Sequence, residues 1–124
     1  MDKEYTKQLV ESCPILYRGG FSFECHGGWF ELISDLSMKL EVICEQAHMQ
    51  GTPINKLPKA SQVKEKFGSL RFYMTHGLEG MHELIEKAED VSDGICDKCG
   101  SPGEIRSDGG WHRARCKKCW DKAS

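Results

Sequence analysis

Hydrophobic and polar positions along this chain repeat with two different periods, and each period predicts a different kind of element. Between residues 29 and 49, apolar side chains recur every three or four positions, which predicts a long helix that Gly51 can end. The same spacing predicts shorter helices over residues 2–12, stopping before Pro14, and over residues 79–92. The stripe of the long helix is Trp29, Leu32, Ile33, Leu36, Leu40, Ile43, Cys44 and Ala47.

The opposite face of the long helix is acidic. We expect this face to be solvated, with an acidic protein-binding surface as the alternative interpretation. Its residues are Glu31, Asp35, Glu41 and Glu45, offset mainly by Lys39.

A period of two appears in the segment VKEKFGSLRFYM, residues 63–74, where apolar and charged side chains alternate on both sides of Gly68-Ser69. This pattern predicts a β-hairpin over residues 63–75, with a tight turn at the glycine. A single strand with a glycine bulge and a helix ending at Gly68 are alternatives. The preceding residues 51–62 contain two prolines and predict a linker, and Phe21–Cys25 predicts a short strand.

Four of the seven cysteines form two CxxC pairs separated by sixteen residues. A CxxC turn lets two thiolates converge on one cation, and two such turns complete the tetrahedron that zinc prefers, at about 2.3 Å from each sulfur. The spacing predicts one structural Zn²⁺ and leaves no coordination position for water. A redox pair, a disulfide framework and His112 as a replacement ligand are the alternatives. The predicted ligands are Cys96, Cys99, Cys116 and Cys119.

The residues between the two pairs predict a zinc ribbon. Short strands at Glu104–Arg106 and Trp111–Arg115 flank the turn signal Asp108-Gly109-Gly110. Since Gly94 leads directly into the first pair, we expect the ribbon to be docked on the last helix. The predicted fold class is α+β, with a body over residues 1–94 and a ribbon over residues 95–124.

Charge and composition limit the functions to be considered. The net charge is −2, with 39% hydrophobic and 29% charged residues, so neither a strongly basic nucleic-acid binder nor a disordered chain is indicated. Residues 1–50 hold eight acidic and four basic side chains, whereas residues 91–124 hold five and seven. No apolar run of about 18 residues and no apolar leader occur, so we expect a cytoplasmic protein without a membrane partner. In that reducing setting Cys13, Cys25 and Cys44 are expected to be free thiols.

Catalytic motifs are missing from the sequence. It contains no HExxH, GxSxG, GxxxxGK[ST] or GxGxxG pattern. The adjacent Cys25 and His26 have no evident orienting group, and Asn55, the single asparagine, lies too far from the ribbon for a zinc-supported His-Asn-His nuclease. We therefore predict that the protein is not an enzyme.

Three segments together resemble a family of small, mostly uncharacterised proteins of tailed phages and prophages. They are CHGGWFELISDL, VKEKFGSLRFYM and CDKCGSPGEIRSDGGWHRARCKKC. The family pattern is GWxxLIxxL, then KEKFGxLRFY, then a terminal CxxC ribbon with a Trp before its last ligand pair. The resemblance implies a phage-type accessory protein, and such proteins often bind and redirect or block a host protein, including defence components. It supplies no catalytic residues.

These observations favour a protein that binds and modulates a host protein. The alternative is a nucleic-acid-binding ribbon, because basic side chains are concentrated in the ribbon beside Trp111 and Trp120. In a purely structural interpretation of the ribbon, Trp111 packs against the first helix and does not contact nucleic acid. Phe21, Phe23, Tyr73 and Trp120 are candidate exposed aromatics. The expected contact residues are Arg113, Arg115, Lys117 and Lys118, followed by Arg71 and Tyr73.

Overall fold

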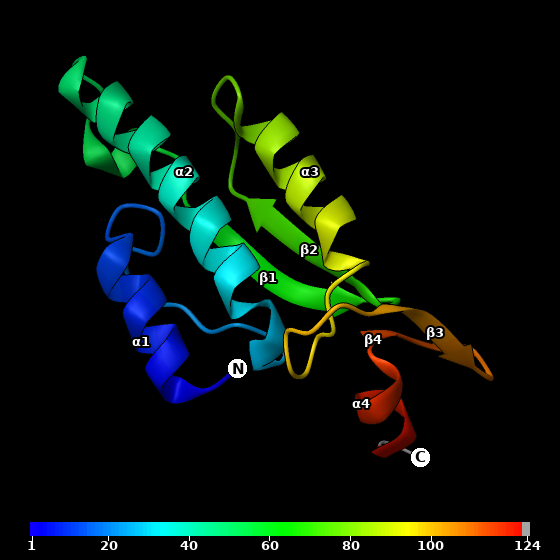
Figure 1. Cartoon of the computed structure of the whole chain (residues 1–124). Coiled ribbons are helices and arrows are strands. Elements are labelled where there is room, and N and C mark those ends of the chain that lie inside the picture. Colours follow the sequence, from blue (N-terminus) through cyan, green and yellow to red (C-terminus); the bar gives the residue numbers. More distant parts are fainter. Residues whose placement is uncertain (123–124) are drawn as a thin grey trace.

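The computed structural model describes residues 1–122, in which three helices precede a small C-terminal hairpin and a short final helix (Figure 1). All three helices predicted from the sequence form, each within two residues of its expected bounds. The first begins where the Asp2 carboxylate accepts a hydrogen bond of 2.7 Å from the Glu4 amide. No helix within the described part of the chain is long and apolar enough to cross a lipid bilayer. The three helices are α1 (Lys3–Ser12), α2 (Phe30–Met49) and α3 (Met81–Ser92).

The segment with a period of two forms a hairpin, so the bulged-strand and helical alternatives are excluded. β1 (Ala60–Lys66) pairs antiparallel with β2 (Ser69–Met74). Phe67 and Gly68 make the two-residue turn with φ of +53° and +88°, a pair of positive values typical of a type I′ turn. β1 begins inside residues 51–62, which the sequence predicted to be a linker.

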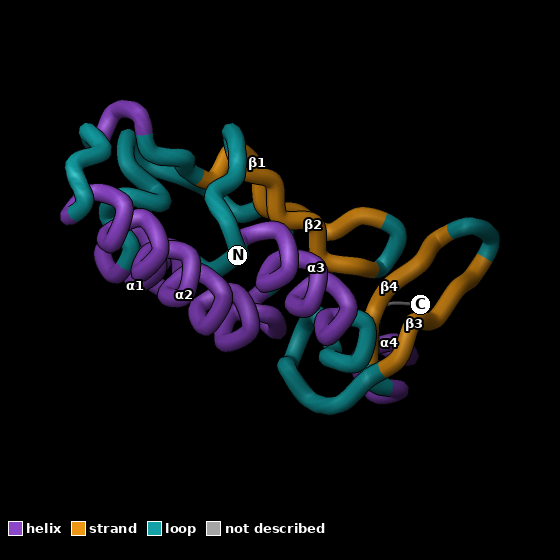
Figure 2. The backbone as a smooth tube through the Cα atoms, turned by 90° about the horizontal axis from the view of Figure 1, so that it is seen from above, coloured by secondary structure: helices purple, strands orange, loops and turns teal. Residues whose placement is uncertain are grey.

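Helices α2 and α3 cover one face of the hairpin, and the core of the body lies between these two layers (Figures 1 and 2). α1 packs against α2, where Tyr5 stacks on Phe30 with ring centroids 4.1 Å apart. Burial of apolar surface, at roughly 25 cal/mol per Å², is the main force that holds such layers together. The most deeply buried side chains include Leu16, Tyr17, Trp29, Ile33, Leu40, Val63 and Leu70.

Side chains of α3 cover the outer edge of β2. The Leu70 amide donates to Ser92 Oγ at 3.0 Å. Two residues further on, the Phe72 amide donates to Glu89 Oε2, also at 3.0 Å. Backbone donors at the edge of a sheet would otherwise face solvent, so the helix satisfies them with its own polar side chains.

The segment before α2 runs beside the outer edge of β1. Glu24 forms a parallel bridge with Lys64, and this bridge replaces the short strand predicted over Phe21–Cys25. Phe23 is buried, and Phe21 packs against it with ring centroids 4.9 Å apart. The prediction that Phe23 is exposed was therefore wrong, because the segment folds over the core.

Glu41 departs from the predicted solvated face of α2. Its side chain is buried, and its carboxylate accepts hydrogen bonds from the Ile15 amide at 3.1 Å and the Leu16 amide at 2.8 Å. A buried carboxylate needs such partners because desolvation is costly. Glu41 thus ties the turn after α1 to the middle of α2.

The C-terminal residues form the predicted ribbon. β3 (Glu104–Asp108) and β4 (Trp111–Arg115) pair antiparallel, and the unpredicted α4 (Lys117–Lys122) follows. The ribbon continues directly from α3, and the Gly103 amide donates to the Gly94 carbonyl at 2.9 Å. The ribbon is therefore docked, and the start of α2 and the tip of the hairpin add further contacts, described below.

Candidate metal centre

Four cysteines from the two ends of the ribbon bring their sulfurs together. Cys96 and Cys99 lie in the turn after α3, Cys116 follows β4 and Cys119 belongs to α4. Their Sγ atoms all lie within 4.8 Å of one another, and the Sγ atoms of Cys99 and Cys116 are 3.8 Å apart. A tetrahedral ion bonded to sulfur at about 2.3 Å requires sulfurs about 3.8 Å apart. The cluster can therefore hold a metal ion with sulfur in all four positions.

The backbone of the first CxxC turn closes around this cluster through a glycine. Gly100 has φ of +81°, and its amide donates to the Cys96 carbonyl at 3.0 Å. This left-handed conformation suits glycine because it lacks a Cβ. In the second turn, the Cys119 amide donates to Cys116 Sγ at 3.4 Å.

Cys99 is the most exposed residue of the four, and its surroundings favour the ionised form of its thiol. Hydrogen bonds from the Ser101 side chain and backbone lower the pKa of the Cys99 thiol to about 6. A thiolate is the form that binds metal, so this ligand loses its proton readily near neutral pH.

The start of α2 holds the first CxxC turn. Trp29, which is fully buried, donates from Nε1 to the Ile95 carbonyl at 3.0 Å. The Gly28 amide donates to the Asp97 carbonyl at 2.9 Å. A Cβ on Gly28 would lie only 2.2 Å from the Cys96 carbonyl oxygen, so only glycine permits this approach. The GGW sequence before α2 is thus a docking element for the metal-binding turn.

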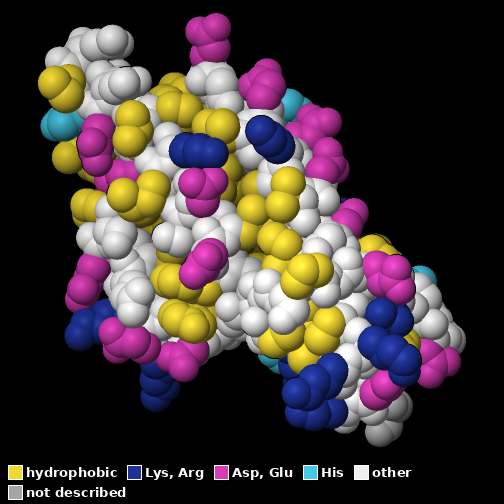
Figure 3. Space-filling view, in the orientation of Figure 1, with side chains coloured by type: hydrophobic (Ala, Val, Ile, Leu, Met, Phe, Trp, Pro, Cys, Tyr) yellow, Lys and Arg dark blue, Asp and Glu magenta, His cyan; other side chains and the backbone are white. Residues whose placement is uncertain are grey.

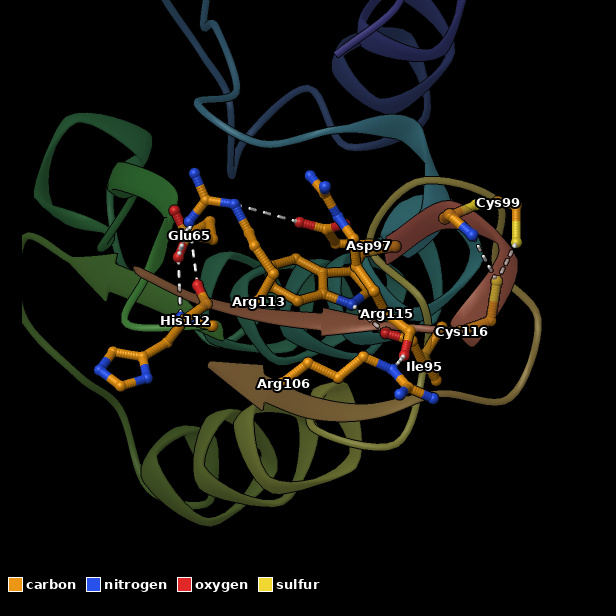
Figure 4. A network of polar contacts seen from close by, with 12 residues as sticks. Glu65, Ile95, Asp97, Cys99, Arg106, His112, Arg113, Arg115 and Cys116 are labelled. Carbon is orange, nitrogen blue, oxygen red and sulfur yellow. Dashed lines mark hydrogen bonds and ion pairs between the residues drawn. The ribbon is translucent and has the colours of Figure 1, made fainter. Parts of the chain in front are cut away.

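A buried ion pair links the two CxxC turns (Figure 4). Asp97, in the first turn, accepts a hydrogen bond of 2.9 Å at Oδ1 from Nε of Arg115, which directly precedes Cys116. The side chains are 1% and 3% exposed. A pair this deeply buried is costly to break because one charge would remain without a partner.

The tip of the β1–β2 hairpin holds the ribbon from the other side. Arg113 reaches Glu65 with an Nη1–Oε2 distance of 2.6 Å, and Glu65 also accepts a hydrogen bond from the Gly68 amide at 2.8 Å (Figure 4). A Cβ on Gly68 would lie 3.2 Å from the Arg113 amide nitrogen. The turn and the ribbon strand therefore pack backbone to backbone.

The six predicted contact residues do not form one surface. Arg115 is buried and Arg113 is half-buried, and both guanidinium groups are held by carboxylates, so neither offers a free cation to a partner. Lys117 and Lys118 are exposed on α4, where Lys117 pairs with Asp121 at 2.8 Å. The remaining two, Arg71 and Tyr73, lie on β2, away from α4.

The aromatic residues of the ribbon contact each other and not α1. Trp111 stacks on Trp120 of α4 with ring centroids 5.0 Å apart and planes at 20°. The guanidinium carbons of Arg113 and Arg115 each lie 5.2 Å from the Trp111 ring centroid. Trp111 thus joins β4 to α4, where the structural alternative had placed it against the first helix.

His112 takes no part in the cluster. Its Nδ1 lies 2.5 Å from Ser107 Oγ on the neighbouring strand. Among residues 1–122, the side chains close enough to share a metal ion are the four cysteines alone. All seven cysteines, including Cys13, Cys25 and Cys44, are free in the structure.

Cys25 and His26 line a cavity of about 270 Å³ together with Asp97 and Arg113. Burial raises the pKa of the Cys25 thiol to about 11, and burial lowers the pKa of His26. The thiol therefore stays protonated at neutral pH, and a protonated thiol is a poor nucleophile. This pair does not provide an activated cysteine.

Sequence reasoning found the four clustered cysteines but missed the residues that dock them, chiefly Gly28, Glu65 and Asp97. Comparison of the chain with family models, curated proteins and solved structures finds no match in any of the three. The sequence did contain one signal for these docking residues. Gly28, Glu65 and Asp97 each lie in one of the three segments on which the family resemblance rests, and these segments meet at the ribbon.

Proposed function

We propose that this chain is a non-enzymatic, zinc-stabilised protein that binds a host protein and modulates or inhibits it. The observation that carries the proposal is an open apolar groove between α2 and α3. The family resemblance supports a phage-type accessory role, in which the partner belongs to the host and is a candidate defence component. Reduced thiols throughout the chain support a cytoplasmic setting.

Zinc is the metal that this donor set fits best. Thiolates are soft ligands, and a tetrahedral set of four sulfurs is typical of zinc or of iron–sulfur centres. Two CxxC turns joined by a β-hairpin are characteristic of structural zinc ribbons. With four thiolates bound, the ion has no open position for substrate, and its role is to hold the ribbon against the body.

The groove between α2 and α3 has the composition of a protein-binding surface. It measures about 260 Å³, and apolar side chains of both helices line it. Val91 is 44% exposed there, and charged side chains stand along the rim. Figure 3 shows hydrophobic side chains gathered over α2 and α3 on this face. The apolar lining is Leu32, Leu36, Leu84, Ala88 and Val91, and the rim is Asp35, Lys39 and Lys87.

Apolar surface flanked by charges is what a partner helix or extended segment with apolar anchors would cover. The rim contains both signs of charge, because Asp35 and Lys39 pair on α2 at 3.0 Å while Lys87 stands on α3. Such a rim suits a protein partner better than a uniformly negative nucleic-acid backbone.

The test is capture of a bacterial protein by the tagged, metal-loaded chain from a lysate, run with and without nuclease treatment. We expect Val91→Glu to abolish capture of a discrete partner, because a carboxylate would be desolvated in the interface. Val42→Glu is the matched control, since Val42 is 47% exposed on α2 and lies outside the groove.

Two results would contradict the proposal. One is capture that survives Val91→Glu, and the other is an equal loss with both variants. Circular dichroism and metal content of each variant show whether a loss of binding reflects a loss of fold. A captured protein that is lost on nuclease treatment would mean that nucleic acid, and not the groove, links it to the chain.

A further inference from the structure

The β1–β2 hairpin has a second face, which the fold does not use. Val63, Leu70 and Phe72 point into the core, so the alternate positions point away from it. Helices α2 and α3 lie on the core side of the strands (Figure 2). The outward-pointing side chains of the motif are Gln62, Lys64, Lys66, Arg71 and Tyr73.

Like charges face each other on this outer side. Lys64 and Arg71 are directly opposite in the strand register, and Lys66 follows at the next outward position. Like charges in cross-strand pairs destabilise a hairpin. None of these three cations forms an ion pair with any residue of the described range. At the edge of the face, the Glu24 carboxylate is engaged by Gln62 at 3.0 Å.

Exposed aromatic rings stand at both ends of this row of cations. Tyr73 is 40% exposed beside Lys64, whose Nζ lies 6.0 Å from the ring centroid. Phe67 is 69% exposed at the tip, with Lys66 Nζ at 5.7 Å. At about 3.4 Å per residue, Tyr73 lies roughly 15 Å from the tip.

Phe67 lowers the stability of the fold at its position in the turn. Its φ of +53° falls in the left-handed region, where asparagine, aspartate or glycine is usual and a bulky side chain is an outlier. Its ring is mostly exposed and meets His112 only edge-on, at a centroid distance of 6.4 Å. An exposed aromatic kept in a strained turn indicates a role in contacting something outside the molecule.

We propose that the outer face of the β1–β2 hairpin binds single-stranded nucleic acid. Phosphates lie along Lys64, Lys66 and Arg71, and bases stack on Phe67 and Tyr73. A cationic track with aromatic platforms is the arrangement that binds single strands with little sequence preference. The site is separate from the α2–α3 groove and from the ribbon cations, most of which carboxylates already hold.

The test is fluorescence anisotropy of labelled oligothymidylate and oligouridylate with the metal-loaded full chain, at several salt concentrations. With three phosphate contacts, the plot of log K against log salt should have a slope of about −2. Lys64→Glu with Arg71→Glu should abolish most binding and flatten this slope. Lys3→Glu with Lys7→Glu, which makes the same change in charge on α1, should leave the slope unchanged.

Aromatic variants separate stacking from simple charge attraction. Tyr73→Ala and Phe67→Ala should each weaken binding by about 5-fold to 150-fold, since stacking of one base contributes about 1–3 kcal/mol. Tyr73→Phe retains the ring and should retain binding. Metal content and circular dichroism confirm that each variant is folded.

Three results of the binding assay would overturn this proposal. They are no oligonucleotide binding at low salt, an equal loss with the α1 control pair, and full binding by the variant that carries both Tyr73→Ala and Phe67→Ala. Two further results would also overturn it: a preference for duplex over single strand, and capture of an acidic protein through this face. The groove variant Val91→Glu should bind oligonucleotide normally, so failure of this proposal is distinguishable from failure of the protein-binding one.

Discussion

The body and the ribbon are held together by different forces. The body buries large apolar side chains from all its helices and strands, among them Trp29, Ile33 and Val63. The ribbon buries only Ala114 and Cys96 from the apolar class within its described residues, beside the charged Asp97 and Arg115. The body can therefore fold through the hydrophobic effect, whereas the ribbon depends on ion pairs, on a surface on which to dock and, in our proposal, on a bound metal ion.

Because of this difference, the contacts between the body and the ribbon depend on the ribbon being folded. Trp29 and Gly28 from the body hold the first CxxC turn, while Glu65 holds Arg113 of the ribbon. A metal ion held by the four cysteines would order the partners of these contacts. Loss of the metal should therefore destabilise the ribbon and the junction first, and the core of the body least.

The largest expected effect is loss of the metal. Cys99→Ser should lower metal content and unfold the ribbon, with loss of solubility as its buried charges and aromatic rings are exposed. Structural zinc contributes about 10–16 kcal/mol to the folding of isolated zinc-finger peptides. Cys25→Ser is the control, because Cys25 lies outside the cluster. Metal analysis and amide exchange would check this, and a metal-free Cys99→Ser protein with protected ribbon amides would disprove the structural role.

The next largest effect should come from the buried ion pair. Asp97→Ala leaves the Arg115 guanidinium buried without its carboxylate and should cost about 3–5 kcal/mol. Lys117→Ala breaks the exposed Lys117–Asp121 pair and should cost about 0–1 kcal/mol. Urea unfolding of the metal-loaded variants measures both. Similar costs would mean that the ion pair does not hold the two turns together.

A smaller effect is expected at the contact between α2 and the ribbon. Gly28→Ala places a methyl group against the Cys96 carbonyl and should destabilise the protein by about 1–3 kcal/mol. Gly77→Ala is the matched control, since a Cβ there meets no atom within 4 Å and φ is not left-handed. If thermal unfolding shows equal stability for the two variants, the close approach at Gly28 is not required.

The smallest effect concerns thiols of the body at alkaline pH. Burial raises the pKa of Cys13 to about 12 and that of Cys44 to about 11, from an ordinary value of 9.0. Unfolded thiols lose their protons first, so stability should fall as pH rises above about 9, by up to about 1.4 kcal/mol per pH unit for each thiol. Urea midpoints at increasing pH would show this. Cys44→Ala should reduce the slope, and an unchanged slope would contradict the assignment.

Local patterns in the sequence were enough to predict the helices, the hairpin and the cluster of four cysteines. α2 was predicted because its apolar residues repeat with the helical period over five turns. The cysteine cluster was predicted because CxxC spacing lets two thiols converge on one point. α4 was missed because six residues are too few to show a period.

What the sequence could not predict depends on partners far away along the chain. Glu41 is buried because the amides of Ile15 and Leu16 meet it, some 25 residues earlier. Arg115 appeared to be a free cation because its carboxylate, Asp97, lies 18 residues away.

The side chains that cover the hairpin edges have a consequence for how copies of this protein behave together. Ser92 and Glu89 accept hydrogen bonds from two backbone amides of β2, and Glu24 forms a backbone bridge to the middle of β1. An incoming strand from another copy would have to displace them before it could extend the sheet. The hairpin therefore resists growth into fibrils and strand exchange, and the protein should remain dispersed at concentrations where an uncovered hairpin would polymerise.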